Sequence, residues 1–234
     1  MDGPPVTPGK KVTMNDRPES RPSAIIDTDP TGPAASHWQD VYKTRSADEV
    51  SWFQAEPQPS LDLIRAASVR GSAIDVGGGA SSLAAHLVRD GFDHVTVLDL
   101  SAEALETARE AVKDAPGADA IRWLHADLLA WRPDRTFDLW HDRAVFHFLT
   151  DPSDRAAYLA TLRAALAPGG TVVLGGFGPE GPTHCSGLPV ARRSTDELAA
   201  ELGDDFTTLD ARTQVHHTPA GASQSFSWLT ARRR

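Results

Sequence analysis

The chain has 234 residues, of which 40% are hydrophobic and 24% are charged, and its formal net charge is −9. The length suffices for one globular domain with a sizeable core, and the acidic balance disfavours a nucleic-acid substrate, which needs a basic surface. The single cysteine, Cys185, excludes an internal disulfide and favours a reducing compartment. Because no segment approaches the ~20 apolar residues of a membrane span and the N-terminus lacks the apolar core of a signal peptide, we expect a cytoplasmic protein.

Residues 1–35 hold seven of the 17 prolines and few side chains that can be buried, which predicts a disordered leader. Order is expected to begin near Ser36. Ser46 and Glu49 have the spacing of a capping box, which predicts a short helix through Phe53. The same stretch gathers aromatic side chains that can dock it on the domain, cover a ligand as a lid, or do both: Trp38, Tyr42, Trp52 and Phe53.

Strand and helix patterns alternate through the middle of the chain. Short apolar runs predict strands over residues 73–76, 94–100, 121–125, 137–141 and 171–175. Amphipathic segments predict helices over residues 60–69, 81–89, 101–114 and 154–167. Strands that alternate with helices at this spacing imply right-handed βαβ units and a parallel sheet.

The last quarter of the chain departs from this alternation. Residues 177–190 form a long loop rich in glycine and proline, and a second capping box at Ser194 and Glu197 opens a helix to Leu202. Two further strands, over 207–217 and 225–230, are joined by too few residues for a crossover helix, so they should form an antiparallel hairpin at the sheet edge. The predicted fold is a Rossmann-like α/β domain with a mostly parallel seven-stranded sheet and helices on both faces.

The stretch from Ala73 to Leu87 has the pattern of a strand, a tight turn and a helix. Asp75 stands at the end of the strand. The turn contains Gly77, Gly78 and Gly79, which have no Cβ atoms, so a ligand can lie directly on the backbone. Free N–H groups at the start of the helix point toward the same place. This stretch therefore predicts a cradle for a small molecule.

A nicotinamide dinucleotide does not fit the cradle well, because the third position of its glycine fingerprint is Ser82. Asp99 lies 20 residues past Gly79, at a spacing that suits a carboxylate accepting from ribose hydroxyls. It can also serve only as a charge at a helix N-terminus.

Asp127 follows the third strand, where it can accept from an exocyclic amine of adenine while Leu128 packs on the ring. Asp75, Asp99 and Asp127 would thus lie at the carboxyl ends of three strands, the edge at which such sheets bind ligands. Three carboxylates suit a ligand with hydroxyls, amines and a positive centre better than a pyrophosphate.

Taken together, these elements resemble the class I S-adenosylmethionine-dependent methyltransferases. The matching segments follow the family's order within about residues 60 to 176: Asp75–Gly79, Leu98–Ser101, Ala126–Leu128, Phe137–Arg143 and Leu166–Leu174. The C-terminal hairpin fits as well, because that fold ends with an antiparallel strand. Ser81 departs from the family by replacing a third glycine, but serine is small enough to leave the cradle usable. The tryptophan-rich N-terminal segment is more distantly similar to that of the thiol and thiopurine methyltransferases.

The resemblance implies S-adenosylmethionine as the cofactor. Gly77 and Gly79 would hold its methionine part, Asp99 its ribose, and Asp127 and Leu128 its adenine. The remaining implied cofactor positions are Asp75, Leu100, Asp142 and Arg143, together with a cover made by Trp38, Tyr42 and Trp52.

The implied reaction is in-line displacement of the methyl group by a small-molecule N, O or S nucleophile, helped mainly by alignment, desolvation and proximity. A base is needed only if the nucleophile must lose a proton. The candidate catalytic residues are Asp142, His141 and His147. His147 can equally be a packed core histidine, and His141 can simply pair with backbone.

No metal is expected. His184 and Cys185 are adjacent, as are His216 and His217, whereas structural zinc ligands are usually spaced by two to four residues. The loop around Cys185 is expected to face the substrate. Arg192 and Arg193 can bind an anionic group, although a solvated pair is the favoured interpretation.

We expect one methyltransferase domain over residues 36–234, with a monomer favoured. Residues 36–70 would form the lid, 71–176 the cofactor-binding core, and 177–234 the substrate loop and hairpin. Two alternatives stay open. A protein lysine methyltransferase would share every cofactor motif, and a non-catalytic cofactor-binding module would keep Gly77, Gly79 and Asp99 but lack a reachable active-site mouth.

Overall fold

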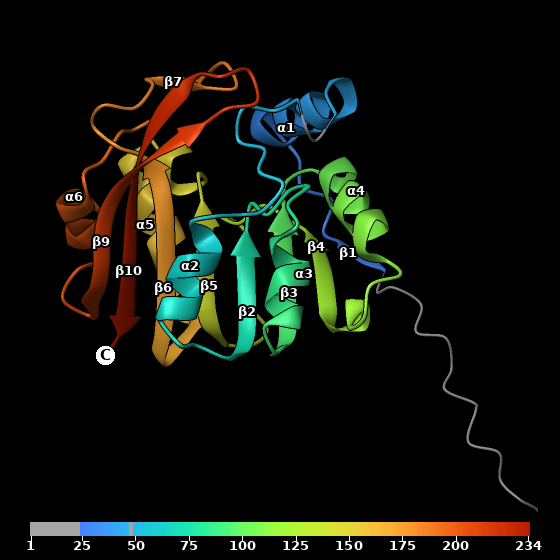
Figure 1. Ribbon diagram of the computed structural model, residues 1–234, viewed down its shortest axis with the longest axis horizontal. Coiled ribbons are helices and arrows are strands. Elements are labelled where there is room, and N and C mark those ends of the chain that lie inside the picture. Colours follow the sequence, from blue (N-terminus) through green and yellow to red (C-terminus); the bar gives the residue numbers. More distant parts are fainter. Residues whose placement is uncertain (1–23, 47–48) are drawn as a thin grey trace, which may run out of the picture.

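Eight strands form one sheet in the computed structural model, which describes residues 24–46 and 49–234. The strand order is β1-β4-β3-β2-β5-β6-β10-β9 (Figure 1). Its strands are β1 (Ile25–Asp27), β2 (Gly71–Val76), β3 (Phe92–Asp99), β4 (Ile121–His125), β5 (Phe137–Arg143), β6 (Leu166–Phe177), β9 (Phe206–His217) and β10 (Ser223–Arg233). A separate small hairpin pairs β7 (His184–Cys185) with β8 (Leu188–Pro189).

The helices connect and cover these strands. They are α1 (Pro33–Thr44), α2 (Ser60–Ala66), α3 (Leu83–Arg89), α4 (Ala102–Val112), α5 (Pro152–Ala165) and α6 (Thr195–Leu202), with short 3₁₀ helices η1 (Ala118–Ala120) and η2 (Phe146–Phe148). None of the helices in the described ranges is both long enough and apolar enough to cross a membrane.

The predicted Rossmann-like fold is confirmed. Strands β1 to β6 pair in parallel, and β10 runs antiparallel to both β6 and β9. The capping box at Ser194 and Glu197 forms and opens α6, and Ser101 caps α4 by accepting from the Ala104 N–H at 3.2 Å. Three strands exceed their predicted ends, because β5 continues to Arg143, β6 to Phe177 and β10 to Arg233.

The eighth strand, β1, lies in the predicted disordered leader, so that prediction is wrong for residues 24–35. Ile25 and Ile26 pair in register with β4, and the Asp27 carboxylate contacts the His125 ring at 2.7 Å. Pairing with the edge of β4 provides the backbone partners that a polar, proline-rich segment lacks by itself. The rest of the predicted leader, residues 1–23, lies outside the described residues.

Side chains of successive strand residues separate the core into two layers. Ile74 and Val76 of β2 face α5 and α6, whereas Ala73 faces α2, α3 and α4. In Figure 1 the helices α2, α3 and α4 lie on the near face of the sheet, and α5 and α6 lie behind it.

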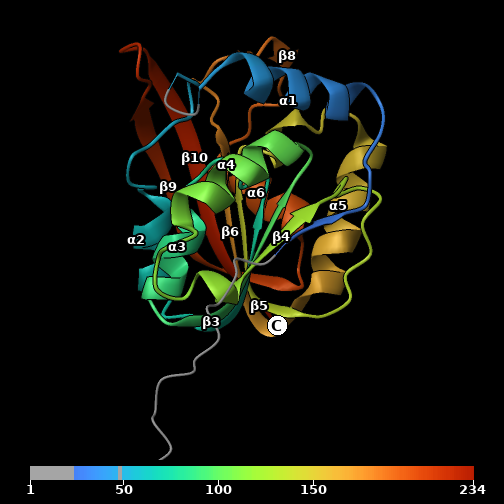
Figure 2. The ribbon, with the colours of Figure 1, turned by 90° about the vertical axis from the view of Figure 1, so that its right-hand side faces the viewer.

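Helix α1 lies across the carboxyl ends of the parallel strands (Figure 2). Its Gln39 accepts from the Ser101 hydroxyl at 3.1 Å, and Lys43 pairs with Glu103 at 3.7 Å. The helix predicted to run through Phe53 is wrong for residues 49–53, which form turns. Pro57 follows within a few residues, and a proline cannot lie inside a helix, so the segment before it is too short to form a stable one.

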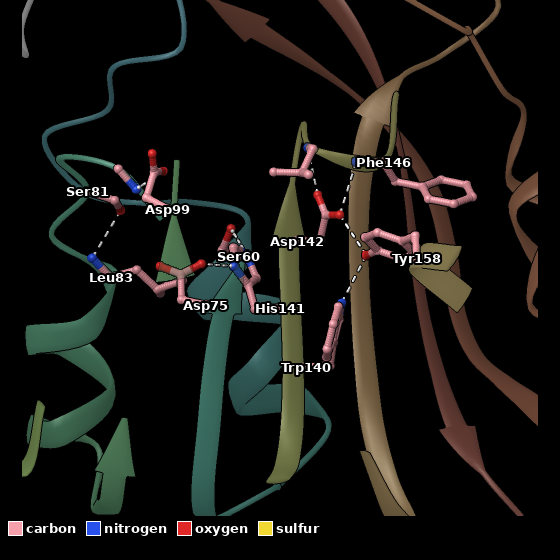
Figure 3. Close-up of polar contacts among 12 residues, drawn as sticks. Ser60, Asp75, Ser81, Leu83, Asp99, Trp140, His141, Asp142, Phe146 and Tyr158 are labelled. Carbon is pink, nitrogen blue, oxygen red and sulfur yellow. Dashed lines mark hydrogen bonds and ion pairs between the residues drawn. The ribbon is translucent and has the colours of Figure 1, made fainter. Parts of the chain in front are cut away.

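A buried hydrogen-bonded chain joins β5 to α5 (Figure 3). The Trp140 indole N–H donates to the Tyr158 hydroxyl at 2.9 Å, which donates to Asp142 Oδ2 at 2.6 Å. All three side chains are fully buried, so each depends on the others for its partners.

We predict that Tyr158→Phe lowers the free energy of unfolding by about 2–4 kcal/mol, because it leaves the buried Trp140 N–H without a partner and removes one of the two hydrogen bonds to Asp142 Oδ2. Urea denaturation at pH 7.5 measures the loss. The Trp140→Phe variant and the double variant complete a thermodynamic cycle, in which the two changes should be less than additive. A loss below about 0.5 kcal/mol for Tyr158→Phe would contradict the structural role.

Candidate functional site

A cavity of about 350 Å³ lies under α1 at the carboxyl ends of the strands. Most of the predicted site residues line it: Trp38, Tyr42, Trp52, Gly77, Asp99, Leu100, Asp127, Leu128, Arg143 and His147. A neighbouring cavity of about 160 Å³ is lined by Asp75 and His141, and Gly77 and Arg143 border both spaces. Neither wall includes Gly79 or Asp142.

The glycine turn follows β2 and is held by hydrogen bonds from its own amides. The Gly77 N–H donates to the Leu98 carbonyl at 2.7 Å, and the Gly79 N–H donates to Asp99 Oδ2 at 2.9 Å. Both glycines have positive φ angles, of 63° and 51°. A Cβ atom on Gly79 would lie 2.5 Å from the Tyr42 hydroxyl. The turn therefore requires glycine at both positions for conformation and for space.

Ser81 stands where the resemblance implies a third glycine, and its side chain has a local role. The Ser81 hydroxyl accepts from the Leu83 N–H at 3.1 Å, at the start of α3 (Figure 3). It thereby satisfies one of the free amides of the first helical turn.

Asp99 connects the glycine turn to α4. Its Oδ2 accepts from Gly79 and its Oδ1 accepts from the Ser101 N–H at 2.8 Å. Burial raises the pKa of Asp99 to about 6, although both amide hydrogen bonds act in the opposite direction. The carboxylate is thus fixed in orientation on the cavity wall.

Asp127 and Leu128 follow β4, in the loop that leads to β5. The Asp127 Oδ1 accepts from the Leu129 N–H at 2.9 Å, which holds the loop, and the side chain is half-buried. Leu128 is buried in the core cluster while it also borders the cavity.

Aromatic rings close the cavity from the side of α1. Trp38 makes edge contacts with Trp52 and Phe148, with ring centroids 5.8 Å and 5.1 Å apart, and Tyr42 contacts Trp52 at 6.2 Å. Burial, with a smaller effect of the Asp99 charge, raises the pKa of Tyr42. These contacts, which we call the aromatic cover, join α1, the 49–53 turn and η2.

His141 has both ring nitrogens occupied by side chains, rather than pairing with backbone. Its Nδ1 contacts Asp75 Oδ1 at 2.7 Å and its Nε2 contacts the Ser60 hydroxyl at 2.8 Å (Figure 3). Asp75 and His141 are register partners on β2 and β5, and all three residues are buried. This network joins α2 to two central strands, which favours a structural role over proton transfer.

Asp142 points to the opposite face of the sheet from His141. Besides Tyr158, its carboxylate accepts from the Val145 N–H at 2.8 Å and the Phe146 N–H at 3.0 Å, which fixes the start of η2. Burial raises its pKa to about 6 against these hydrogen bonds. Since Asp142 borders neither cavity, its position favours support of the adjoining loop over contact with a ligand.

His147 borders the main cavity among aromatic rings, with its ring centroid 4.4 Å from Phe148 and 4.8 Å from Phe177. Its Nδ1 accepts from the Phe177 N–H at 3.3 Å, and its Nε2 has no partner among the described residues. Burial, reinforced by the charge of Arg193, lowers its pKa to about 3. The hydrogen bond to Nδ1 assigns the proton to Nε2, so His147 is neutral and presents a donor rather than a base.

Arg143 and Cys185 lie at the end of the cavity that faces β10. Burial lowers the pKa of Arg143 to about 10, so the guanidinium stays charged at neutral pH. Burial raises the pKa of the Cys185 thiol to about 11, which keeps it protonated. This part of the wall also includes residues that sequence reasoning missed: Phe148, Phe177, Gln224 and Phe226. No local motif marks them, because distant segments bring them together.

The remaining histidines and arginines lie apart from the cavity wall. Arg192 is exposed and donates to the Pro179 carbonyl at 2.7 Å. Arg193 is buried, pairs with Glu201 at 3.3 Å and lies over the Phe146 ring, so the predicted solvated pair is wrong for Arg193. Across residues 24–46 and 49–234, no group of three or more His, Cys, Asp or Glu side chains is arranged to hold a metal ion.

Comparisons with known proteins agree with this geometry. Residues 73–170 match the family described as "Methyltransferase domain". Trans-aconitate 2-methyltransferase of Azoarcus sp. (strain BH72) is 33% identical over 138 residues, which are 58% of this chain and 49% of that enzyme. The chain thus spans about half the length of this curated relative.

Solved structures show the same fold. The 1,6-didemethyltoxoflavin-N1-methyltransferase of Burkholderia thailandensis, crystallised with S-adenosylhomocysteine, has a TM-score of 0.66 and 20% identity over 87% of this chain and 92% of its own. The N-methyltransferase NodS of Bradyrhizobium japonicum WM9, also with S-adenosylhomocysteine, has a TM-score of 0.65 and 17% identity over 83% and 97%.

We predict that Asp99 destabilises the fold increasingly as the pH rises from 4 to 6.5. Its folded pKa of about 6 exceeds the ordinary value of 3.8, so the folded chain holds this proton more tightly than the unfolded chain. The stability of wild type minus that of Asp99→Asn should therefore fall across this range by on the order of 1–3 kcal/mol.

Urea denaturation at several pH values measures this difference. The control is Asp93→Asn, because Asp93 is exposed on the same strand. The difference in unfolding free energy between wild type and Asp93→Asn should not change with pH. If the difference between wild type and Asp99→Asn were equally independent of pH, the raised pKa of Asp99 would be refuted.

Proposed function

We propose that this chain, which belongs to the class I S-adenosylmethionine-dependent methyltransferases, transfers a methyl group from that cofactor to a small-molecule acceptor. The observation that carries the proposal is the wall formed by the glycine turn and Asp99, which face one cavity under the aromatic cover. Glycine backbone, a buried carboxylate and an apolar lid in one place suit an aminoacyl nucleoside.

The residues on this wall fit the parts of S-adenosylmethionine. The turn at Gly77 and Gly79 has no room for a Cβ atom, and its backbone would hold the amino-acid end. Asp99 would accept from the ribose hydroxyls. Asp127 would accept from the adenine amine while Leu128 packs on the ring, and Leu100 borders the same end of the cavity.

When bound, S-adenosylmethionine supplies a methyl group on a sulfonium sulfur, a good leaving group that the acceptor displaces in line. The chain's own contribution is to align the acceptor and exclude water. Trp38, Trp52 and Phe148 close the cavity against solvent. The ring of His147 would line the acceptor's side of the cavity.

A small-molecule acceptor fits the site better than a protein segment. The cavity wall includes rings of the aromatic cover and residues of the β7–β8 hairpin, which supports an enclosed acceptor site over an open acidic groove. The relatives are named for small molecules, trans-aconitate and 1,6-didemethyltoxoflavin. A non-catalytic module would need no further apolar space beside the residues proposed to hold the cofactor. We also propose that the protein is a cytoplasmic monomer and does not bind nucleic acid. Residues 36–70 would form its lid, 71–176 its cofactor-binding core, and 177–234 its substrate loop and hairpin.

An assay with methyl-labelled cofactor tests this function. Panels of small thiols, amines, phenols and carboxylic acids are followed by whole-cell protein as acceptor. Label in small molecules is the expected result. Label only in protein would favour lysine methylation, and no transfer despite tight cofactor binding would favour the non-catalytic module.

We predict that Asp99→Ala lowers affinity for S-adenosylhomocysteine by about 100-fold or more, because two ribose hydroxyls lose a charged acceptor. Isothermal titration calorimetry measures the change, and Asp93→Ala on the same strand should bind normally. Unchanged affinity in Asp99→Ala would remove Asp99 from the cofactor site.

A second prediction concerns the aromatic cover. Titration with S-adenosylhomocysteine should change tryptophan fluorescence, and the Trp38→Phe/Trp52→Phe double variant should lose most of that change. The three fully buried tryptophans, Trp123, Trp140 and Trp228, serve as the internal reference. If the double variant kept the full response, the cover would not close over the cofactor.

A further inference from the structure

Arg143 is a half-buried cation without a carboxylate partner. Among the described residues, no Asp or Glu oxygen lies within the 4.0 Å of an ion pair, although the charge of Asp75 acts on it from farther away. Its Nη1 donates to the Trp52 carbonyl at 2.7 Å, and the guanidinium lies 5.7 Å from the centre of the Phe226 ring. A guanidinium has five N–H donors, so most of its hydrogen-bonding capacity is unused.

The unused donors reach open space rather than a sealed core. Arg143 borders both the main cavity and the cavity beside the glycine turn, and none of its nitrogens is among the buried atoms that lack a partner. A charge held in such an apolar setting is costly unless an anion joins it. The position therefore suits a negatively charged group on a ligand.

The surroundings of Arg143 associate it with the acceptor. Phe226 and Cys185, which flank it, come from β10 and β7, outside the segment that carries the cofactor motifs. The carboxylates of the main cavity wall belong to Asp99, Asp127 and Asp154, on β3, after β4 and on α5. The wall near β10 thus has one positive charge and no negative one.

The same wall lacks a base. Cys185 keeps its proton, and His147 carries its proton on the nitrogen that lacks a partner. The proton acceptors on the cavity wall are the carboxylates of Asp99, Asp127 and Asp154, which come from other elements, so the groups beside Arg143 do not take a proton from the acceptor.

On the basis of the function proposed above, we propose that the methyl acceptor binds as an anion, a carboxylate or another oxyanion or thiolate, with Arg143 as its counter-charge. If the charged atom is also the nucleophile, its lone pair forms the new bond to the methyl carbon. The sulfur–carbon bond breaks, its electrons stay on sulfur, and no proton has to move. His147 is neutral and lies on the same wall, where its ring adds no charge.

The carboxylate of the cofactor is the other anion that can meet Arg143, and the experiment separates the two. Calorimetry first measures binding of S-adenosylhomocysteine to wild type, Arg143→Gln, Arg143→Lys and Arg143→Met. Failure of wild type to bind would refute the proposed function itself. If the acceptor pairs with Arg143, the variants should keep cofactor affinity within about threefold.

The saturated wild-type complex is then titrated with acid and amide pairs of one shape: benzoate and benzamide, cinnamate and cinnamamide, indole-3-acetate and indole-3-acetamide. At least one acid should bind about tenfold or more tightly than its amide, because a desolvated guanidinium pairs with a carboxylate through two hydrogen bonds. Arg143→Gln and Arg143→Met should abolish this preference. Arg143→Lys should keep part of this preference, since lysine retains the positive charge but cannot donate the two parallel hydrogen bonds of a guanidinium.

Arg192→Gln is the matched control, because Arg192 is an exposed arginine on the neighbouring loop and should leave the preference unchanged. Circular dichroism checks the folding of each variant, and the Lys variant keeps the test valid if the neutral variants unfold. The proposal is wrong if no acid binds more tightly than its amide, or if the preference survives in a folded neutral variant. Loss of cofactor affinity with an intact acid preference would assign Arg143 to the cofactor.

Discussion

The alternation of side chains along β5 determines what three consecutive polar residues do. His141 faces α2 and joins Asp75 and Ser60, Asp142 faces α5 and joins Tyr158, and Arg143 returns to the first face at the strand's end. Register fixes this division, because β2 and β5 place Asp75 opposite His141. Two residues thereby stabilise the sheet, and the third reaches the cavity.

Polar side chains whose hydrogen bonds are all made within the protein support the structure, whereas those with unused donors are available to bind a ligand. Asp142 and His141 have every principal hydrogen-bonding site occupied by protein partners, so they hold the loop and the strands. Arg143 has donors left over at the cavity wall, whereas the unpaired Nε2 of His147 is buried. Keeping such groups buried costs stability, which a complementary ligand recovers on binding.

The sequence predicted the framework well, because its signals are local. Glycine at the turn, Ser101 and Ser194 at helix starts, and strand runs separated by helices each report on a few neighbouring residues. It failed where distant pairing decides. Ile25–Asp27 forms a strand only because β4 offers an edge, and the residues after Glu49 form turns on the way to Pro57. The alternation of side chains along β5 could have been predicted from the sequence, and it would have placed His141 and Asp142 on opposite faces of the sheet.

By itself, the sequence determined the parallel sheet, the C-terminal hairpin and the glycine–carboxylate wall, because periodicity, turn residues and motif spacing act over short distances. Tertiary structure alone decided the wall of the cavity around Arg143. It brings Phe177, Cys185 and Phe226 beside Arg143 from elements far apart in the chain. It also decided protonation, because burial and the Phe177 amide fix the proton of His147 on Nε2. The cavity wall around Arg143 and the protonation of His147 both depend on contacts between segments far apart in the chain, which no local sequence pattern encodes.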